Sequence, residues 1–184
     1  MLADAYACQY ANELQFKPSD RDLLNRFVSE VRGRGKVCDM GCAVGHISRF
    51  LHCAGASVFG LDLSRGMIEQ ARKLNPNISF RVGDILSLNV PNEFLIGIVA
   101  FYAIVNIAPD QLSTVFREMQ RVLIPGGVLL LAFHIGNEIL RPDEVLGVRN
   151  SIDFFFFSAR RHHTPARNGG LCDSRGYRAR TVRS

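Results

Sequence analysis

The apolar residues of this chain recur at two spacings, one typical of amphipathic helices and one typical of buried strands. The first clear helix is predicted over residues 19–33, with Ser19 as its N-cap. Its apolar face holds Leu23, Leu24, Phe27, Val28 and Val31. From residue 36 onward, short apolar runs predict strands, and stretches with an apolar residue every three or four positions predict helices between them.

The predicted strands and helices alternate along the chain. Strands are expected at residues 36–39, 57–62, 78–84, 94–105 and 128–134, and helices at 45–55, 63–74 and 110–123. Ser64 is expected to cap the helix that follows the second strand. Alternation with short connections implies right-handed crossovers and a parallel sheet covered by helices on both faces. The fold is therefore predicted as α/β, a doubly wound Rossmann-like parallel sheet of about five strands.

Composition favours a single domain in a reducing compartment. A chain of 184 residues with 47% apolar content can build one well-buried core and hardly two. No apolar stretch reaches the roughly 20 residues of a membrane span, and no cationic segment precedes an apolar one at the start, so a cytoplasmic protein without a membrane partner is expected. The five cysteines, Cys8, Cys38, Cys42, Cys53 and Cys172, show no CxxC pair and no metal-ligand spacing, which predicts reduced thiols and no metal site.

The net charge of +5 comes from the C-terminal end of the chain. Residues 158–184 contain seven arginines and one acid, whereas residues 1–157 contain 15 basic and 16 acidic groups. The few sizeable apolar residues of the C-terminal end have neither helical nor alternating spacing, so they cannot offset the chain entropy of an ordered segment. We therefore predict one domain over residues 1–157 and an Arg-rich, irregular and disordered tail over residues 158–184.

Three predicted strands end on an aspartate, namely Asp39, Asp62 and Asp84. Ligands bind such sheets at the carboxyl ends of the strands, where these acids would lie together. The turn after Asp39 carries glycines at 41 and 45 and leads into a helix, which is a geometry that binds phosphate. An acid beside that turn would repel phosphate by roughly 1 kcal/mol or more per close charge pair. The pattern therefore favours a ligand with a cation and no phosphate.

S-adenosylmethionine is such a ligand, because it combines an ammonium group, a ribose diol and an adenine. Gly41 and Gly45 would let the backbone approach its amino-acid part, and Asp39 would set the loop and interact with the ammonium. Asp62 would accept both ribose hydroxyls. Asp84 would receive the adenine amine beside an apolar wall.

The stretch from Val37 to His134 resembles the class I S-adenosylmethionine-dependent methyltransferases. The segments that carry the resemblance are VCDMGCAVG, VFGLDLSRGMIEQAR, FRVGDILSL, IVAFYAIVNI and LIPGGVLLLAFH, in the order and spacing of that family. The resemblance implies transfer of a methyl group from S-adenosylmethionine to an acceptor, which we expect to be a small molecule. The cofactor contacts that it implies are Asp39, Gly41, Cys42, Gly45, Asp62, Leu63, Met67, Asp84, Ile85 and Phe101. Tyr6 or Tyr10 is implied as a lid over the cofactor.

The chain departs from the family pattern at several positions. Ala43 stands in place of the usual middle glycine, Gly97 in place of an acid, and Asn106 in place of a histidine. No catalytic base is evident, and His134 is the candidate for substrate contact or proton removal. An in-line methyl transfer can proceed through alignment and exclusion of water alone, so a missing base does not argue against the activity.

Alternatives remain for both the function and the tail. A nicotinamide-dependent oxidoreductase is the leading alternative function, and a non-catalytic module that binds S-adenosylmethionine or nucleic acid is another. After the fifth strand the family continues with a helix and an antiparallel hairpin, for which the tail lacks the apolar pattern. We expect a truncated or frame-shifted C-terminus, and the alternative is an arginine-rich arm that binds RNA or another polyanion.

Overall fold

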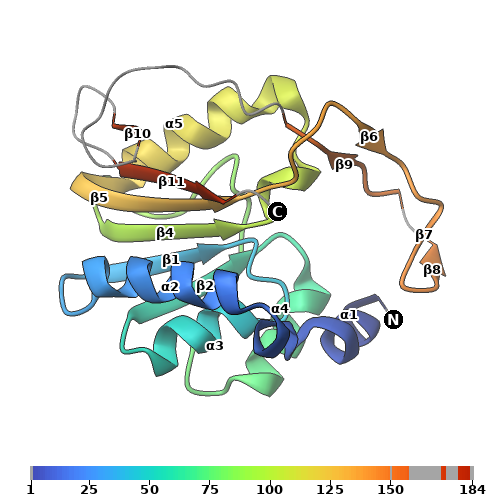
Figure 1. Ribbon diagram of the computed structural model, residues 1–184, viewed down its shortest axis with the longest axis horizontal. Coiled ribbons are helices and arrows are strands. Elements are labelled where there is room, and N and C mark those ends of the chain that lie inside the picture. Colours follow the sequence, from blue (N-terminus) through green and yellow to red (C-terminus); the bar gives the residue numbers. More distant parts are fainter. Residues whose placement is uncertain (1, 150, 158–170, 173–177, 183–184) are drawn as a thin grey trace.

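The computed structural model describes residues 2–149, 151–157, 171–172 and 178–182 (Figure 1). Three helices precede the sheet, namely α1 (Leu2–Tyr10), the 3-10 helix η1 (Glu13–Phe16) and α2 (Pro18–Val31). The alternating part follows as β1 (Lys36–Met40), α3 (His46–Cys53), β2 (Ser57–Asp62), α4 (Arg65–Leu74), β3 (Ser79–Val82), β4 (Leu95–Phe101), the 3-10 helices η2 (Ile104–Asn106) and η3 (Pro109–Gln111), α5 (Leu112–Val122) and β5 (Leu123–Ala132).

The core of the fold is a parallel sheet with the strand order β3-β2-β1-β4-β5. β1 lies in the middle, where Asp39 pairs with Gly60 of β2 on one side and with Val99 of β4 on the other. The chain winds outward in one direction through β2 and β3 and in the other through β4 and β5, so the switch point lies between β1 and β4. The predicted doubly wound α/β fold is confirmed.

Helices cover both faces of this sheet (Figure 1). On one face, Val115 and Met119 of α5 pack with Ile98 of β4 in a buried cluster. On the other face, Phe27 and Val31 of α2 pack against residues from β1, β4 and β5. All seven residues of β4 are buried, which explains why its sequence is apolar without alternation.

Gly97 of β4 has a packing reason. A Cβ atom built on Gly97 would lie 2.7 Å from Cζ of Phe27 and 3.0 Å from Cγ1 of Val31. A residue with a Cβ atom would therefore force the side chains of Phe27 and Val31 to shift. An acid at this position would disturb the packing of α2 on the sheet as it stands.

Two short strands of the tail extend the sheet beyond the five predicted strands. β11 (Arg178–Val182) pairs in parallel with β5, and β10 (Leu171–Cys172) pairs antiparallel with β11. The edge of β5 offers backbone N–H and C=O groups to any extended segment, and such pairing needs no side-chain pattern. These seven positions of the tail are therefore strands, which the irregular pattern of their side chains did not predict. The other positions of residues 158–184, on which the prediction of an irregular tail also rests, lie outside the described residues.

The segments around the sheet differ from the prediction in smaller ways. α2 begins at Pro18 with Lys17 as its N-cap, so the expected N-cap at Ser19 is wrong. Proline fits the first position of a helix, because its fixed φ is helical and its missing N–H would have no partner there. Ser64, in contrast, caps α4 as predicted, and its Oγ accepts the Met67 N–H at 3.3 Å.

After β5 the chain forms an arm of short strands at the carboxyl-end side of the sheet (Figure 1). β6 (Ile139–Leu140) pairs antiparallel with β9 (Phe154–Phe155), and β7 (Glu144–Val145) pairs with β8 (Val148–Arg149). The four cysteines whose side chains are described are free thiols. No helix within the described residues has the length and apolar character of a membrane span.

Candidate functional site

A cavity of about 920 Å³ lies at the carboxyl ends of the parallel strands. α1 and the arm after β5 lie at this same end of the sheet (Figure 1). The predicted site residues that line the cavity are Gly41, Asp62, Leu63, Met67, Asp84, Ile85 and Phe101, together with Tyr6, Tyr10 and His134. The structure thus brings together seven of the ten predicted cofactor contacts, both lid candidates and the candidate base.

The turn after β1 needs left-handed backbone at alternate residues. Gly41 has a φ of +68°, and a Cβ atom built on it would lie 2.5 Å from the Cβ atom of Ala103. Gly45 has a φ of +80° and would meet the ring of Phe80. Ala43 also has a positive φ, +46°, a conformation that costs a residue with a Cβ atom roughly 1–2 kcal/mol. Ala43 therefore stores strain at the position where the family usually has a glycine.

Asp39 lies under the cavity wall and does not line the cavity. It is 1% exposed, and its Oδ2 accepts a hydrogen bond of 2.5 Å from the Ser48 hydroxyl. Burial raises the pKa of Asp39 to about 6, although the Ser48 hydrogen bond acts in the opposite direction. Cys42 and Gly45 are likewise buried and are not among the lining residues. The side chain of Asp39 thus fixes the turn to α3.

Asp62 lies in the cavity wall with a fixed orientation. Its Oδ2 accepts the Ala43 N–H at 2.9 Å, and its Oδ1 accepts the Ser64 N–H at 2.8 Å. Each oxygen keeps lone-pair capacity for one more donor. Burial raises the pKa of Asp62, and the two backbone hydrogen bonds partly offset this effect. The carboxylate is therefore held in place to receive two neighbouring ligand donors.

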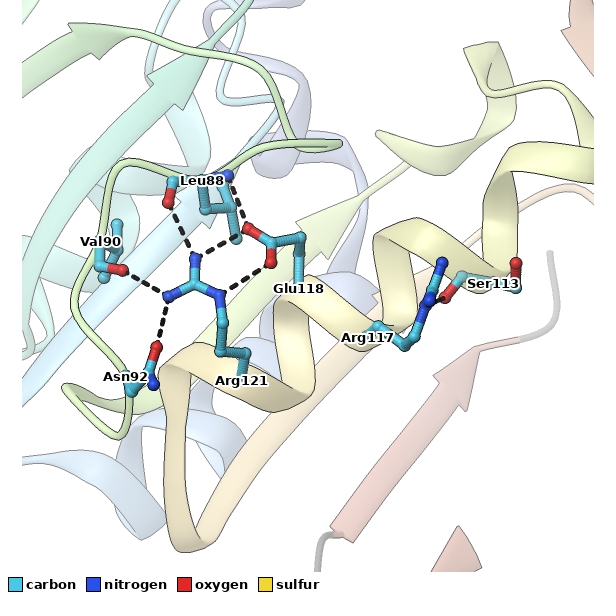
Figure 2. Close-up of polar contacts among 7 residues, drawn as sticks. All are labelled: Leu88, Val90, Asn92, Ser113, Arg117, Glu118 and Arg121. Atoms are coloured by element: carbon cyan, nitrogen blue, oxygen red, sulfur yellow. Dashed lines mark hydrogen bonds and ion pairs between the residues drawn. The ribbon is translucent and has the colours of Figure 1, made fainter.

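Side chains of α5 fix the loop between β3 and β4, which carries Asp84 (Figure 2). Arg121 donates hydrogen bonds to the carbonyl oxygens of Leu88, at 2.9 Å, and Val90, at 2.8 Å. Glu118 pairs with Arg121 at 2.7 Å and accepts the Leu88 N–H at 2.8 Å. At the start of the loop, Asp84 lines the cavity. The network therefore stabilises the part of the wall where the adenine is expected.

The segment before α2 closes the cavity from the other side. Glu13 Oε1 lies 2.8 Å from His46 Nε2, and Glu13 Oε2 accepts a hydrogen bond of 2.7 Å from Lys17 Nζ. Burial alone would raise the pKa of Glu13, but the hydrogen bonds from His46 and Lys17 outweigh it and lower that pKa. Arg49 of α3 donates a hydrogen bond of 2.5 Å to the carbonyl oxygen of Ala11. These contacts tie the first helices to the beginning of α3.

The end of β4 presents aromatic side chains to the cavity. Tyr102 has a φ of +55°, and such strain is common at functional sites. Its ring centroid lies 4.9 Å from that of His134, which also stacks on Phe156 at 5.1 Å. Burial lowers the pKa of His134, and the positive charge of Lys17 lowers it further. The imidazole is therefore neutral at pH 7 and able to accept a proton.

Three charged residues of the cavity wall were not predicted as site residues, namely Glu13, Lys17 and Asp20. They lie in η1, before α2 and in its first turn, respectively. Only the packing of α2 across β4 brings them over the strand ends. The prediction that α2 begins near residue 19 was the available clue, because the start of a helix before a parallel strand lies at the strand's carboxyl end. Among the described residues, no three metal-ligating side chains form a cluster that could hold an ion.

Comparisons with known proteins agree with this geometry. Residues 37–127 match the family described as "Methyltransferase domain". Methyltransferase GfsG from Streptomyces halstedii is 36% identical over 110 residues, which cover 56% of this chain and 39% of that protein. Malonyl-[acyl-carrier protein] O-methyltransferase from Yersinia pestis is 30% identical over 96 residues, 52% of this chain and 35% of that protein.

Solved structures show the same similarity. The PH0226 protein from Pyrococcus horikoshii OT3 has a TM-score of 0.58 at 31% identity, and the match covers 66% of this chain and 59% of that protein. An S-adenosylmethionine-dependent methyltransferase from Mesorhizobium loti has a TM-score of 0.51 at 31% identity, covering 58% and 49%. In sequence and fold, residues 37–127 form a methyltransferase domain similar to the class I S-adenosylmethionine-dependent methyltransferases. It spans only 35% to 39% of the length of the two curated relatives named above.

Proposed function

We propose that this chain binds S-adenosylmethionine and transfers its methyl group to a small-molecule acceptor. The observation that carries the proposal is the cavity at the strand ends, with Gly41, Asp62 and Asp84 in one wall. A nicotinamide dinucleotide would bring a pyrophosphate into a cavity whose fixed charges are mainly carboxylates. The acids and the family match both favour the methyl donor over that alternative.

The wall residues fit the parts of S-adenosylmethionine. Asp62 would accept the ribose hydroxyls with its two oriented oxygens. Asp84 would accept the adenine amine, with the buried Ile85 beside the ring. Lys17, the one lysine or arginine among the lining residues that the structure describes, would pair with the carboxylate of the amino-acid part. Leu63, Met67 and Phe101 would supply apolar contacts.

The chemistry needs little from the protein beyond binding and alignment. When bound, S-adenosylmethionine supplies an activated methyl group on a sulfonium. Tyr6 and Tyr10 of α1 cover the cavity and exclude water, and burial raises the pKa of Tyr6 so that it stays a neutral phenol. The neutral imidazole of His134 would accept a proton from the attacking nucleophile.

The domain boundary and the cytoplasmic location belong to the same proposal. We assign the methyltransferase domain to residues 1–157, because all five parallel core strands and the whole cavity wall fall within it. The location rests on the cysteine pattern of the sequence.

Calorimetric titration with S-adenosylmethionine, S-adenosylhomocysteine and NAD tests the proposal. We expect binding of the first two ligands and a weaker affinity for NAD. Asp62→Asn should weaken the binding of S-adenosylhomocysteine, whereas Asp110→Asn, at an exposed position outside the cavity lining, should not. A preference for NAD in the wild-type chain would refute the proposal.

A further inference from the structure

Asp20 is a carboxylate in the cavity wall without a donor of its own. It lies in the first turn of α2, is 9% exposed and lines the cavity. No hydrogen bond from any described residue reaches its oxygens. Burial raises its pKa, the positive charge of Lys17 acts in the opposite direction, and the charge of Glu13 adds to the rise. Its oxygens are not among the fully buried side-chain atoms that lack a partner, so they remain open to the cavity. A bound molecule can therefore donate a hydrogen bond to the Asp20 carboxylate.

Each of the other charged groups that face the cavity among the described residues has at least one hydrogen-bond partner within the chain. Glu13 is paired with both Lys17 and His46, so the one lining lysine has a partner other than Asp20. Asp62 accepts two backbone N–H groups, and Asp84 accepts the Leu86 N–H at 2.8 Å. Asp20 is therefore the carboxylate of the described wall that has negative charge and no hydrogen-bond donor.

The charge expected of a molecule that binds Asp20 follows from the other residues that line the cavity. Among the residues that the structure describes, four carboxylates line the cavity, those of Glu13, Asp20, Asp62 and Asp84, against one lysine. His134 adds no positive charge at pH 7, because burial and Lys17 lower its pKa. An anionic acceptor would be repelled by this set, whereas a protonated amine would gain a charge-assisted hydrogen bond.

The cavity that Asp20 lines also has apolar and aromatic walls. Phe16, which is 83% exposed, lines it together with Tyr102, Ile152 and Phe154. Lys17 Nζ already lies 5.7 Å from the centroid of the Tyr102 ring, which shows that a cation can occupy this aromatic environment. The same surfaces would bind the carbon skeleton of a small amine.

We propose that Asp20 binds a protonated amino group of the methyl acceptor, so that the acceptor is a small apolar amine. This inference rests on the proposed function, since it assigns Asp20 of the same cavity to the acceptor instead of the methyl donor. Asp20 is a specificity-determining residue in this proposal, and the atom that receives the methyl group is a separate matter.

Three probes of similar shape and different charge test the inference. Phenethylamine, phenethyl alcohol and hydrocinnamate are titrated into the full chain by calorimetry at neutral pH, with and without S-adenosylhomocysteine. The wild type should bind the amine about ten- to a hundredfold more tightly than the other two probes, the effect of one charge-assisted hydrogen bond. Asp20→Asn should abolish this preference, and Asp20→Glu should retain part of it.

The matched control is Asp22→Asn, an exposed position two residues further along the same helix, which should leave the amine preference unchanged. Circular dichroism of each variant confirms that it is folded. Loss of S-adenosylhomocysteine binding in Asp20→Asn would overturn the inference, because Asp20 would then serve the ammonium of the donor. Equal affinity for the three probes, no binding of any probe, or an amine preference that survives in Asp20→Asn would also overturn it. Failure of wild type to bind S-adenosylhomocysteine would instead refute the proposed function.

Discussion

Replacement of Asp39 by asparagine should change the free energy of unfolding relative to wild type in a way that rises with pH. The folded state holds Asp39 at a pKa of about 6, whereas its ordinary value is 3.8. The folded state therefore binds this proton more tightly than the unfolded chain does. The stabilising contribution of the proton is complete below about pH 3.8 and is lost as the pH rises through about 6.

The size of the effect follows from the two pKa values. At about 1.4 kcal/mol for each tenfold difference in proton affinity, the charged carboxylate costs the folded state about 3 kcal/mol above pH 7. Asparagine carries no charge and keeps an oxygen that can accept the Ser48 hydroxyl. Its NH2 group places a hydrogen-bond donor where aspartate has an acceptor oxygen. The cost of this exchange to the stability of the folded state does not vary with pH. The pH dependence of the stability difference therefore isolates the charge.

Urea denaturation at several pH values between 4.5 and 7.5 measures this difference. The free energy of unfolding of Asp39→Asn relative to wild type should rise with pH by about 2 kcal/mol over that interval. The exposed Asp110→Asn is the control, and its stability relative to wild type should not rise in this way. A difference that is constant with pH, or one that grows toward low pH, would refute the reasoning.

Three further substitutions have separate expected outcomes. Ala43→Gly should raise the free energy of unfolding by about 1 kcal/mol in urea denaturation, because glycine removes the strain of the positive φ; an unchanged or lower stability would contradict this. Asp62→Asn should weaken S-adenosylhomocysteine binding about tenfold or more by calorimetry, and full affinity would show that the ribose lies elsewhere. Arg121→Met should lower the free energy of unfolding by about 1–2 kcal/mol, whereas Arg117→Met, whose contacts stay on the exposed side of α5, should cost less than about 0.5 kcal/mol (Figure 2). Equal losses in the two arginine variants would argue against the loop network.

The alternating core could be predicted because its periodicity and its burial have the same cause. β2 has the predicted bounds, 57–62, and α4 begins after its serine cap as expected. Each of these elements buries one continuous apolar surface, and burial is what a hydrophobic pattern records. The parallel, doubly wound arrangement then followed from the alternation of strands and helices with short connections.

The elements that were not predicted are held by interactions other than the burial of an apolar face. α1 has no buried residue, so its sequence carries no apolar stripe, and its tyrosines face the cavity instead of the core. β11 pairs through backbone groups with the edge of β5, which no side-chain pattern reveals. The packing of α2 on the sheet places Lys17, Pro18 and Asp20 at the cavity. This packing depends on Gly97, which lies in a strand far away in sequence.

The aspartates of the site show why residue type alone could not assign their roles. Asp39 has a side-chain partner nine residues away and is closed off from the cavity, so its substitution should act on stability. Asp62 has backbone partners that orient it toward the cavity, so its substitution should act on the methyl donor. Asp20 faces the same cavity with no donor among the described residues, so its substitution should act on the acceptor. The three effects are measured separately, by denaturation, by titration of the methyl donor and by titration of the probes. If a variant changed a measurement other than the expected one, the role of that carboxylate would have to be reassigned. The assignments of the other two would be unaffected.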